Sequence, residues 1–150
     1  MADRLPIPEF DAEGNLPPGD HFATLDEIAA RFVFPRRQKR YELTQTLVKF
    51  VQFVISYRPI RIFIDGSYVT EKQLPSDVDI GIVFPESFDL AGESWRFQGK
   101  SDLTKSLDVE LFKIDTDSKR LENMLNGWKI DLDTQRPKGI VYVELPYDQE

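Results

Sequence analysis

Two short segments carry the residues that could do chemistry. They are Asp65-Gly66-Ser67 and, after nine intervening residues, Asp77-Val78-Asp79. If Asp77 and Asp79 lie on a strand, their side chains point to the same face, about 7 Å apart along the chain. Two ionised carboxylates so close repel each other, and a divalent cation removes that cost. Because oxygen-only ligands suit Mg²⁺ or Mn²⁺, the pair predicts a site for one of these ions.

A second acidic pair has the same spacing further along the chain. Asp108 and Glu110 fall on another expected strand. If that strand neighbours the first, three or four carboxylates converge, as two-metal phosphoryl transfer requires. The spacing places Asp108 and Glu110 on one face, so either can be the third ligand, or both can be solvated on an edge strand. We favour Asp108, because its side chain is shorter and stiffer.

The residues before the first acidic pair offer a phosphate-binding element. Gly66 and Ser67 stand where an expected strand ends, and glycine lets the backbone approach a ligand closely. Free backbone N–H groups there, together with the Ser67 hydroxyl, can hold a phosphate oxygen. Lys72 is a further candidate for a phosphate contact. Arg136 and Lys138 could also touch a triphosphate, but for these two residues we favour the alternative of an exposed turn. One segment is therefore expected to bind a triphosphate and the next to hold its metal ions.

The pattern Gly66-Ser67-x9-Asp77-x-Asp79, with a later strand acid at Asp108, resembles the motif of the polymerase-beta-type nucleotidyltransferase superfamily. The wider sequence is similar to small bacterial nucleotidyltransferase-like proteins, through the segments 16–19, 65–70, 75–79 and 137–141. The resemblance implies that Asp77 and Asp79 bind metal, that Asp108 is the third carboxylate, and that Gly66 and Ser67 bind phosphate. This sequence departs from the family pattern at residues 68–70, because minimal nucleotidyltransferases often carry an arginine or a further glycine soon after Gly-Ser.

The same resemblance implies an activity. The chain is expected to be an enzyme that moves a nucleoside monophosphate from a nucleoside triphosphate to a hydroxyl of a protein or RNA acceptor, with Mg²⁺ or Mn²⁺. A toxin–antitoxin or phage-defence setting is also implied. The alternative is an inactive nucleotidyltransferase fold that acts as a binding module or antitoxin through a protein partner. Retention of all three aspartates favours the enzyme, because a retired site usually loses an acid.

Composition excludes several other kinds of site. The 150 residues include no cysteine and one histidine, His21. Disulfides, thiolate zinc sites, a cysteine nucleophile and a histidine-rich metal site are therefore excluded. No apolar run approaches the ~20 residues that span a bilayer, so we expect a cytoplasmic protein without membrane contact.

Charge is spread unevenly along the chain. There are 19 basic and 26 acidic side chains, a net charge of −7, which disfavours a general nucleic-acid binder. Residues 35–61 nevertheless carry seven basic side chains and one acidic side chain. The basic residues at 36–40 are either a solvated helix start or a surface for a protein partner; they are Arg36, Arg37, Lys39 and Arg40.

Hydrophobic patterning predicts the elements that position these residues. It indicates one α/β (α+β) domain over residues 1–150, with a small mixed sheet, flanking helices and a nucleotidyltransferase-like fold. Helices are expected from the Thr24-x-x-Glu27 capping box to residue 32, over 36–57, and over 118–126 with Gly127 after the end. Strands are expected over 60–64, 78–84, 107–114 and 139–145. Residues 1–23 are expected to form a turn-rich arm, and 86–105 an irregular connection.

Overall fold

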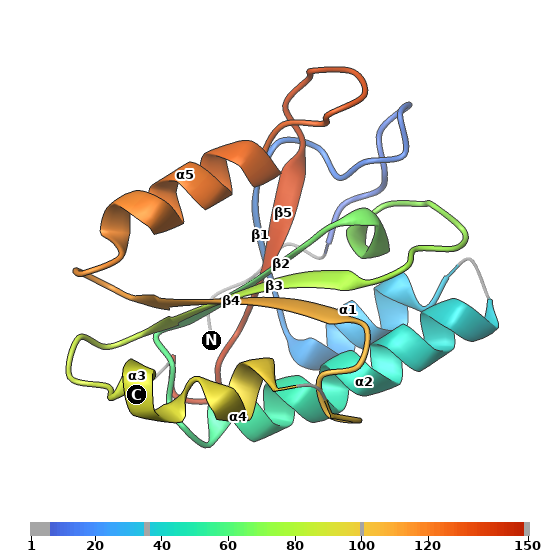
Figure 1. Ribbon diagram of the computed structural model, residues 1–150. Helices are drawn as coiled ribbons and strands as arrows, with labels where there is room; N and C mark the ends of the chain where they lie inside the picture. Colours follow the sequence, from blue (N-terminus) through green and yellow to red (C-terminus); the bar gives the residue numbers. More distant parts are fainter. Residues whose placement is uncertain (1–6, 35–36, 100, 149–150) are drawn as a thin grey trace.

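The structure is a computed structural model that describes residues 7–34, 37–99 and 101–148. Five strands form one mixed sheet in the order β1-β5-β2-β3-β4. Their bounds are Gly19–Ala23 (β1), Arg61–Asp65 (β2), Val78–Phe84 (β3), Leu107–Lys113 (β4) and Gly139–Val143 (β5). The β1/β5 and β3/β4 pairs are parallel, whereas β2 runs antiparallel to both β3 and β5 (Figure 1). The expected mixed α/β architecture is confirmed.

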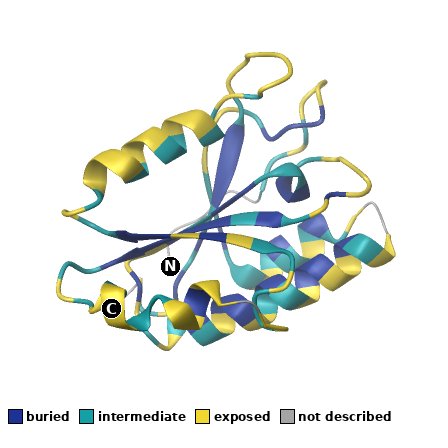
Figure 2. Ribbon diagram, in the orientation of Figure 1, coloured by how far each residue is buried: buried dark blue, intermediate teal, exposed yellow. Residues whose placement is uncertain are grey.

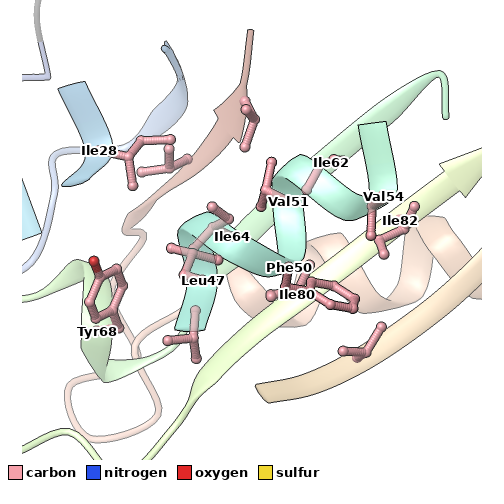
Figure 3. Close-up of a cluster of buried hydrophobic side chains, with 14 of the residues drawn as sticks. Ile28, Leu47, Phe50, Val51, Val54, Ile62, Ile64, Tyr68, Ile80 and Ile82 are labelled. Carbon is pink, nitrogen blue, oxygen red and sulfur yellow. The ribbon is translucent and has the colours of Figure 1, made fainter. Parts of the chain in front are cut away.

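One face of the sheet carries the hydrophobic core. Successive strand residues point to opposite faces, and the alternate residues Ile62, Ile64, Ile80 and Ile82 are all fully buried. They pack against helices α1 (Leu25–Phe32) and α2 (Gln38–Ile55), as Figure 3 shows. The long helix is buried along this face because apolar residues recur three and four positions apart.

The opposite face of the sheet is partly polar and carries helix α5 (Ser118–Trp128) (Figure 1). None of the residues of α5 is buried (Figure 2). Gly81 of β3 lies beneath it, where an added Cβ would stand 2.7 Å from the Met124 methyl group. The missing side chain at Gly81 therefore lets α5 lie close to β3. The β3 residues on the same face as Gly81, including Asp79, point toward α5 and away from the core.

Helix α1 begins as the capping box predicts. The Glu27 backbone N–H donates to the Thr24 hydroxyl (3.1 Å), and the Thr24 N–H donates to the Glu27 carboxylate (3.3 Å). None of the helices in the part of the chain that the structure describes is long and apolar enough to cross a membrane.

The expected turn-rich arm is wrong for residues 19–23. They form β1, which pairs in parallel with β5, from Gly19 opposite Gly139 to Ala23 opposite Val143. The sequence Gly-Asp-His-Phe-Ala lacks apolar alternation because β1 is an edge strand with only its inner end buried. The His21 ring is bonded to the Pro17 carbonyl (2.6 Å), so this histidine is used in the local structure of the strand.

The bounds of β2, β4, β5 and α2 differ from the prediction by one or two residues, and two further regions differ in kind. Helix α5 continues through Gly127 to Trp128, and its C-cap is Lys129, whose backbone N–H donates to the carbonyls of Leu125 and Gly127. Residues 86–105 contain two short helices, α3 (Leu90–Glu93) and α4 (Trp95–Gln98). Phe97 holds α4 against the core, because it is buried among aromatic rings, 5.4 Å from the ring centre of Phe84 and 5.1 Å from that of Tyr57.

Arg40 does not belong to the expected basic surface. Its side chain is fully buried, and every hydrogen bond that the structure gives it goes to a backbone carbonyl. These acceptors, at 2.5–3.3 Å, are the carbonyls of Phe32, Ser67, Tyr68, Thr70 and Lys72. One guanidinium thus fastens the end of α1 to the segment that follows β2. Arg37 lies exposed and donates to Gln73 (2.6 Å), and Arg36 lies outside the described residues.

Replacing Arg40 with Met is expected to lower the free energy of unfolding by about 3 kcal/mol or more, because several buried carbonyls lose their donor. Arg40→Lys should lose less, since an ammonium group can still reach some of them. Urea unfolding monitored by circular dichroism measures both. Arg37→Met is the control and should change stability by no more than about 0.5 kcal/mol. Equal losses in Arg40→Met and Arg37→Met would contradict the bracing role.

Candidate functional site

Three aspartates lie side by side across the sheet. The strand register sets Asp65 of β2 opposite Asp79 of β3, and Asp79 opposite Asp108 of β4. Residues in register on neighbouring strands point to the same face, with about 4.8 Å between strands. Asp77 precedes β3 and lies two residues before Asp79. We call Asp65, Asp77, Asp79 and Asp108 the acidic cluster. The strands predicted over 78–84 and 107–114 are neighbours, which is the condition for their acidic side chains to lie close together.

Asp79 is the centre of this cluster. Burial and, after it, the neighbouring charges of Asp77, Asp108 and Asp65 together raise the pKa of its carboxyl to about 6, although Lys138 acts in the opposite direction. The carboxylate lies against Gly66, where an added Cβ would stand 2.9 Å from Asp79 Oδ2. Gly66 also has φ +91°, which side chains disfavour, so a glycine is needed at this position for two reasons.

Asp65 and Lys138 form a buried ion pair that the sequence reasoning missed. The Lys138 ammonium lies 2.5 Å from Asp65 Oδ1, and the exposed fractions of the two side chains are 13% and 5%. Burial raises the pKa of Asp65 to about 6, although Lys138 and the Gly66 N–H act in the opposite direction. The alternative of an exposed turn is wrong for Lys138, which enters the site because β5 pairs with β2.

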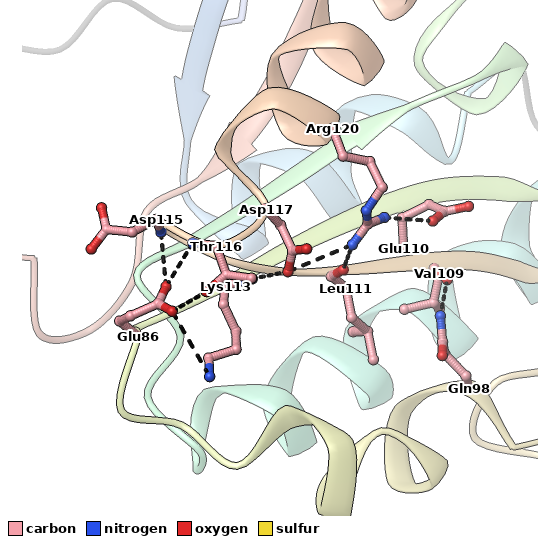
Figure 4. Close-up of polar contacts among 10 residues, drawn as sticks. All are labelled: Glu86, Gln98, Val109, Glu110, Leu111, Lys113, Asp115, Thr116, Asp117 and Arg120. Atoms are coloured by element: carbon pink, nitrogen blue, oxygen red, sulfur yellow. Dashed lines mark hydrogen bonds and ion pairs between the residues drawn. The ribbon is translucent and has the colours of Figure 1, made fainter.

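Glu110 and Asp108 share a face but have different partners. Glu110 pairs with Arg120 of α5 (3.4 Å), and Arg120 also donates to the Leu111 carbonyl (Figure 4). Asp108, by contrast, is one of the charges that raise the pKa of Asp79, and both line the same cleft. The geometry therefore sets Asp108 beside Asp79, and directs Glu110 toward α5.

The expected phosphate-binding residues are brought together only in part. Gly66 and Ser67 lie directly after Asp65, and Ser67 begins a short 3-10 helix over Ser67–Val69. Within the described residues the Ser67 hydroxyl makes no hydrogen bond. Lys72 contributes its backbone carbonyl to Arg40, while its side chain is exposed and is not joined to the acidic cluster by any bond among residues 7–34, 37–99 and 101–148.

A divalent cation such as Mg²⁺ needs several oxygen ligands around one point. Among the described residues, no group of three or more acidic or histidine side chains is arranged to hold a metal ion. The chemistry of the cluster nevertheless suits a hard cation, because Asp77, Asp79 and Asp108 offer carboxylate oxygens only. Burial is the main cause of the raised pKa of Asp79, and the negative charges of its neighbours add to it; a bound cation would offset that negative charge.

Replacing Asp79 with Asn is expected to stabilise the fold at pH 7.5. The carboxyl has a pKa of about 6 in the folded chain and ~3.9 in an unfolded chain, so the folded state binds more protons between these values. The wild type therefore loses stability as the pH rises from about 4 to about 6, and Asp79→Asn avoids that loss. We expect a gain of about 1 kcal/mol at pH 7.5, allowing for solvent screening, and no gain near pH 4.

Urea unfolding of both proteins at the two pH values measures this difference. Asp133→Asn, at an exposed position, is the matched control and should show no such pH dependence. A loss of stability in Asp79→Asn at pH 7.5 would contradict this prediction. It would mean that the ionised carboxylate is stabilised by favourable contacts in the folded protein.

Comparison with known proteins adds a family without an assigned activity. Neither the curated proteins nor the solved structures include a significant match to this chain. A family of unknown function, DUF6932, matches residues 8–144, which include the whole acidic cluster, Gly66, Ser67 and Lys138. The chain therefore belongs to the DUF6932 family.

Proposed function

We propose that this protein is a metal-dependent nucleotidyltransferase that moves a nucleoside monophosphate from a nucleoside triphosphate to a hydroxyl group. The observation that carries the proposal is the strand register, which aligns Asp65, Asp79 and Asp108 on one face beside the turn at Gly66 and Ser67. The turn at Gly66 and Ser67, which follows β2, thus lies beside the carboxylates of β3 and β4. The resemblance of the same residues to the polymerase-beta-type motif supports the reaction class.

Each residue has a role that follows from its position. Asp77 and Asp79 would hold Mg²⁺ or Mn²⁺, with Asp108 as the third carboxylate; the ion neutralises phosphate charge and lowers the pKa of the acceptor hydroxyl. The Ser67 hydroxyl and the backbone at Gly66 bind phosphate oxygens. Asp108 accepts the proton of the acceptor hydroxyl as its oxygen bonds to the α-phosphorus and pyrophosphate leaves.

Asp65 acts through Lys138 rather than as a ligand. Its carboxylate is nearly buried and already neutralised by Lys138, so it is the member of the cluster least available to a cation. The pair fixes β5 to the end of β2, immediately before Gly66. The positive charge of Lys138 also lowers the pKa of Asp79, which keeps that carboxylate more readily ionised. Asp65 and Lys138 are therefore positioning residues.

The acceptor is proposed from the resemblance, and the surface for a protein partner from charge. We propose a protein or RNA hydroxyl as the acceptor and a toxin–antitoxin or phage-defence role, both on the resemblance alone. Since Arg40 is buried, the exposed Arg37 and the half-buried Lys39 are the basic side chains that a protein partner would meet among the described residues of the 36–40 segment. An inactive fold that binds a partner without transfer is the alternative function.

The double variant Asp77→Asn/Asp79→Asn is expected to abolish Mg²⁺-dependent binding of a non-hydrolysable triphosphate analogue, measured by calorimetry. Asp108→Asn should keep most of that binding but lower single-turnover nucleotide transfer by about 10²-fold or more, because its role is needed in the transition state. The transfer assay uses labelled nucleoside triphosphates with a cell lysate as the source of acceptors.

Glu110→Gln is the matched control, because Glu110 shares the strand and the face of Asp108 but pairs with Arg120. It should keep nearly full transfer. A dead Glu110→Gln enzyme beside an active Asp108→Asn enzyme would overturn the assignment. Unchanged binding in the double variant would refute the metal site, and nucleotide binding without transfer in the wild type would favour the inactive binding module.

A further inference from the structure

A cleft of about 470 Å³ opens between β4 and α5, and the acidic cluster forms one end of it. Its lining combines carboxylates with apolar and amide side chains, and the paired Glu110 and Arg120 side chains also line it. The residues that matter here are Asp79, Asp108, Phe112, Asn123, Met124 and Trp128. A ligand whose charged end is held at Asp79 and Asp108 can therefore place an uncharged part against the apolar and amide side chains of the cleft.

Helix α5 is fixed over the sheet by contacts near both of its ends. Gly81 forms the close approach of α5 to β3, with Met124 at 2.7 Å and Trp128 at 3.5 Å from where a Cβ would stand. The first turn of α5 is tied to β4, because the Lys113 backbone N–H donates to Asp117 (2.8 Å) and Arg120 donates to the Leu111 carbonyl (Figure 4). Both ends of the helix are thus anchored to the sheet.

The chemistry of the walls selects a flat, uncharged ring. Trp128 and Met124 offer apolar surface, and the volume lies within the range of about 300–1,000 Å³ typical of small-molecule sites. Arg120 is not free to bind a phosphate, since it lies 4.1 Å from the centre of the Phe112 ring and pairs with Glu110. Asn123 makes no side-chain hydrogen bond within the described residues, so its amide is free to pair with a ligand.

We propose that this cleft binds the adenine base of the nucleoside triphosphate whose phosphates lie at the acidic cluster; this inference rests on the proposed function. The adenine ring stacks on Trp128, as bases do on aromatic side chains. The Asn123 amide offers one donor and one acceptor, which match N7 and the N6 amino group of adenine and not the two acceptors N7 and O6 of guanine. A polynucleotide in the cleft would bring further phosphates against Glu110 and the aspartates, which disfavours it.

The test compares ATP with inorganic triphosphate, each in the presence of Mg²⁺, by calorimetry on the full chain. The wild type should bind ATP about 10-fold or more tightly than triphosphate, because stacking adds to phosphate binding. Trp128→Leu should lose that advantage and leave triphosphate binding unchanged. Trp95→Leu is the matched control, since Trp95 is 63% exposed and lies on α4, and it should keep the wild-type ratio.

Asn123→Ala, at an exposed helix position, separates base recognition from folding. It should reduce the preference for ATP over GTP several-fold without changing triphosphate binding. In a Trp95→Phe background, ATP should also quench the fluorescence of Trp128, and triphosphate should not.

Each outcome bears on one proposal or the other. If triphosphate binds but ATP binds no more tightly, or if Trp128→Leu and Asn123→Ala keep the wild-type ratios, the base site is refuted while the proposed phosphate and metal site stands. If neither ligand binds the folded wild type, the proposed function fails first. If a short RNA depends on Trp128 and ATP does not, the cleft belongs to an acceptor and the base assignment is overturned.

Discussion

Repulsion among the carboxylates of the acidic cluster is the interaction against which the surrounding fold holds the site together. Asp79 lies between Asp65 and Asp108 because backbone pairing on both sides of β3 fixes the register. The side chains cannot separate without breaking that register, and a one-residue slip would turn them toward the core. Burial and, after it, the charges of Asp77, Asp108 and Asp65 raise the pKa of Asp79 to about 6, so repulsion accounts for part of this shift. Such tension is characteristic of functional sites, where stability is given up for reactivity.

Three features let the fold tolerate this concentration of charge. Lys138 neutralises Asp65, the most buried member of the cluster. Gly66 leaves room for the Asp79 carboxylate and adopts a backbone conformation that side chains disfavour. Arg40 then holds the chain from Ser67 to Lys72 through its backbone carbonyls, so the segment beside the aspartates keeps one shape. The site is thus braced from the core side of the sheet, while its open side faces α5 and the cleft.

The sequence predicted the elements that have strong apolar periodicity. The 78–84 strand has the predicted bounds, and the long second helix is shorter by two residues at each end than the predicted 36–57. Strand β1 was missed because an edge strand of mixed polarity carries no such signal. The convergence of Asp79 and Asp108 could be anticipated from matched spacing on two strands, but the choice between Asp108 and Glu110 depended on Arg120, which only the packing of α5 places near Glu110.

Contacts between residues far apart in the chain could not be predicted from the sequence. Lys138 and Asp65 are 73 residues apart, and their pairing depends on which strand lies beside β2. Arg40 stands in a run of basic residues that reads as solvated, and its acceptors are backbone carbonyls, which no residue type reveals. In both cases the sequence shows only a charge with no evident partner. Asp65 stands at the end of a buried strand, and Arg40 stands near the start of a helix, where the helix dipole disfavours a positive charge.

The claim at the centre of this account is that the carboxylates of Asp77 and Asp79 share a cation with a triphosphate. Crystals grown with Mn²⁺ and a non-hydrolysable nucleoside triphosphate test it directly, because anomalous scattering locates manganese without ambiguity. The account predicts an anomalous peak between Asp77 and Asp79, with Asp108 nearby, phosphate density at Gly66 and Ser67, and the Asp65–Lys138 pair intact. Manganese found only at other surface carboxylates, with nucleotide absent from the acidic cluster, would contradict it.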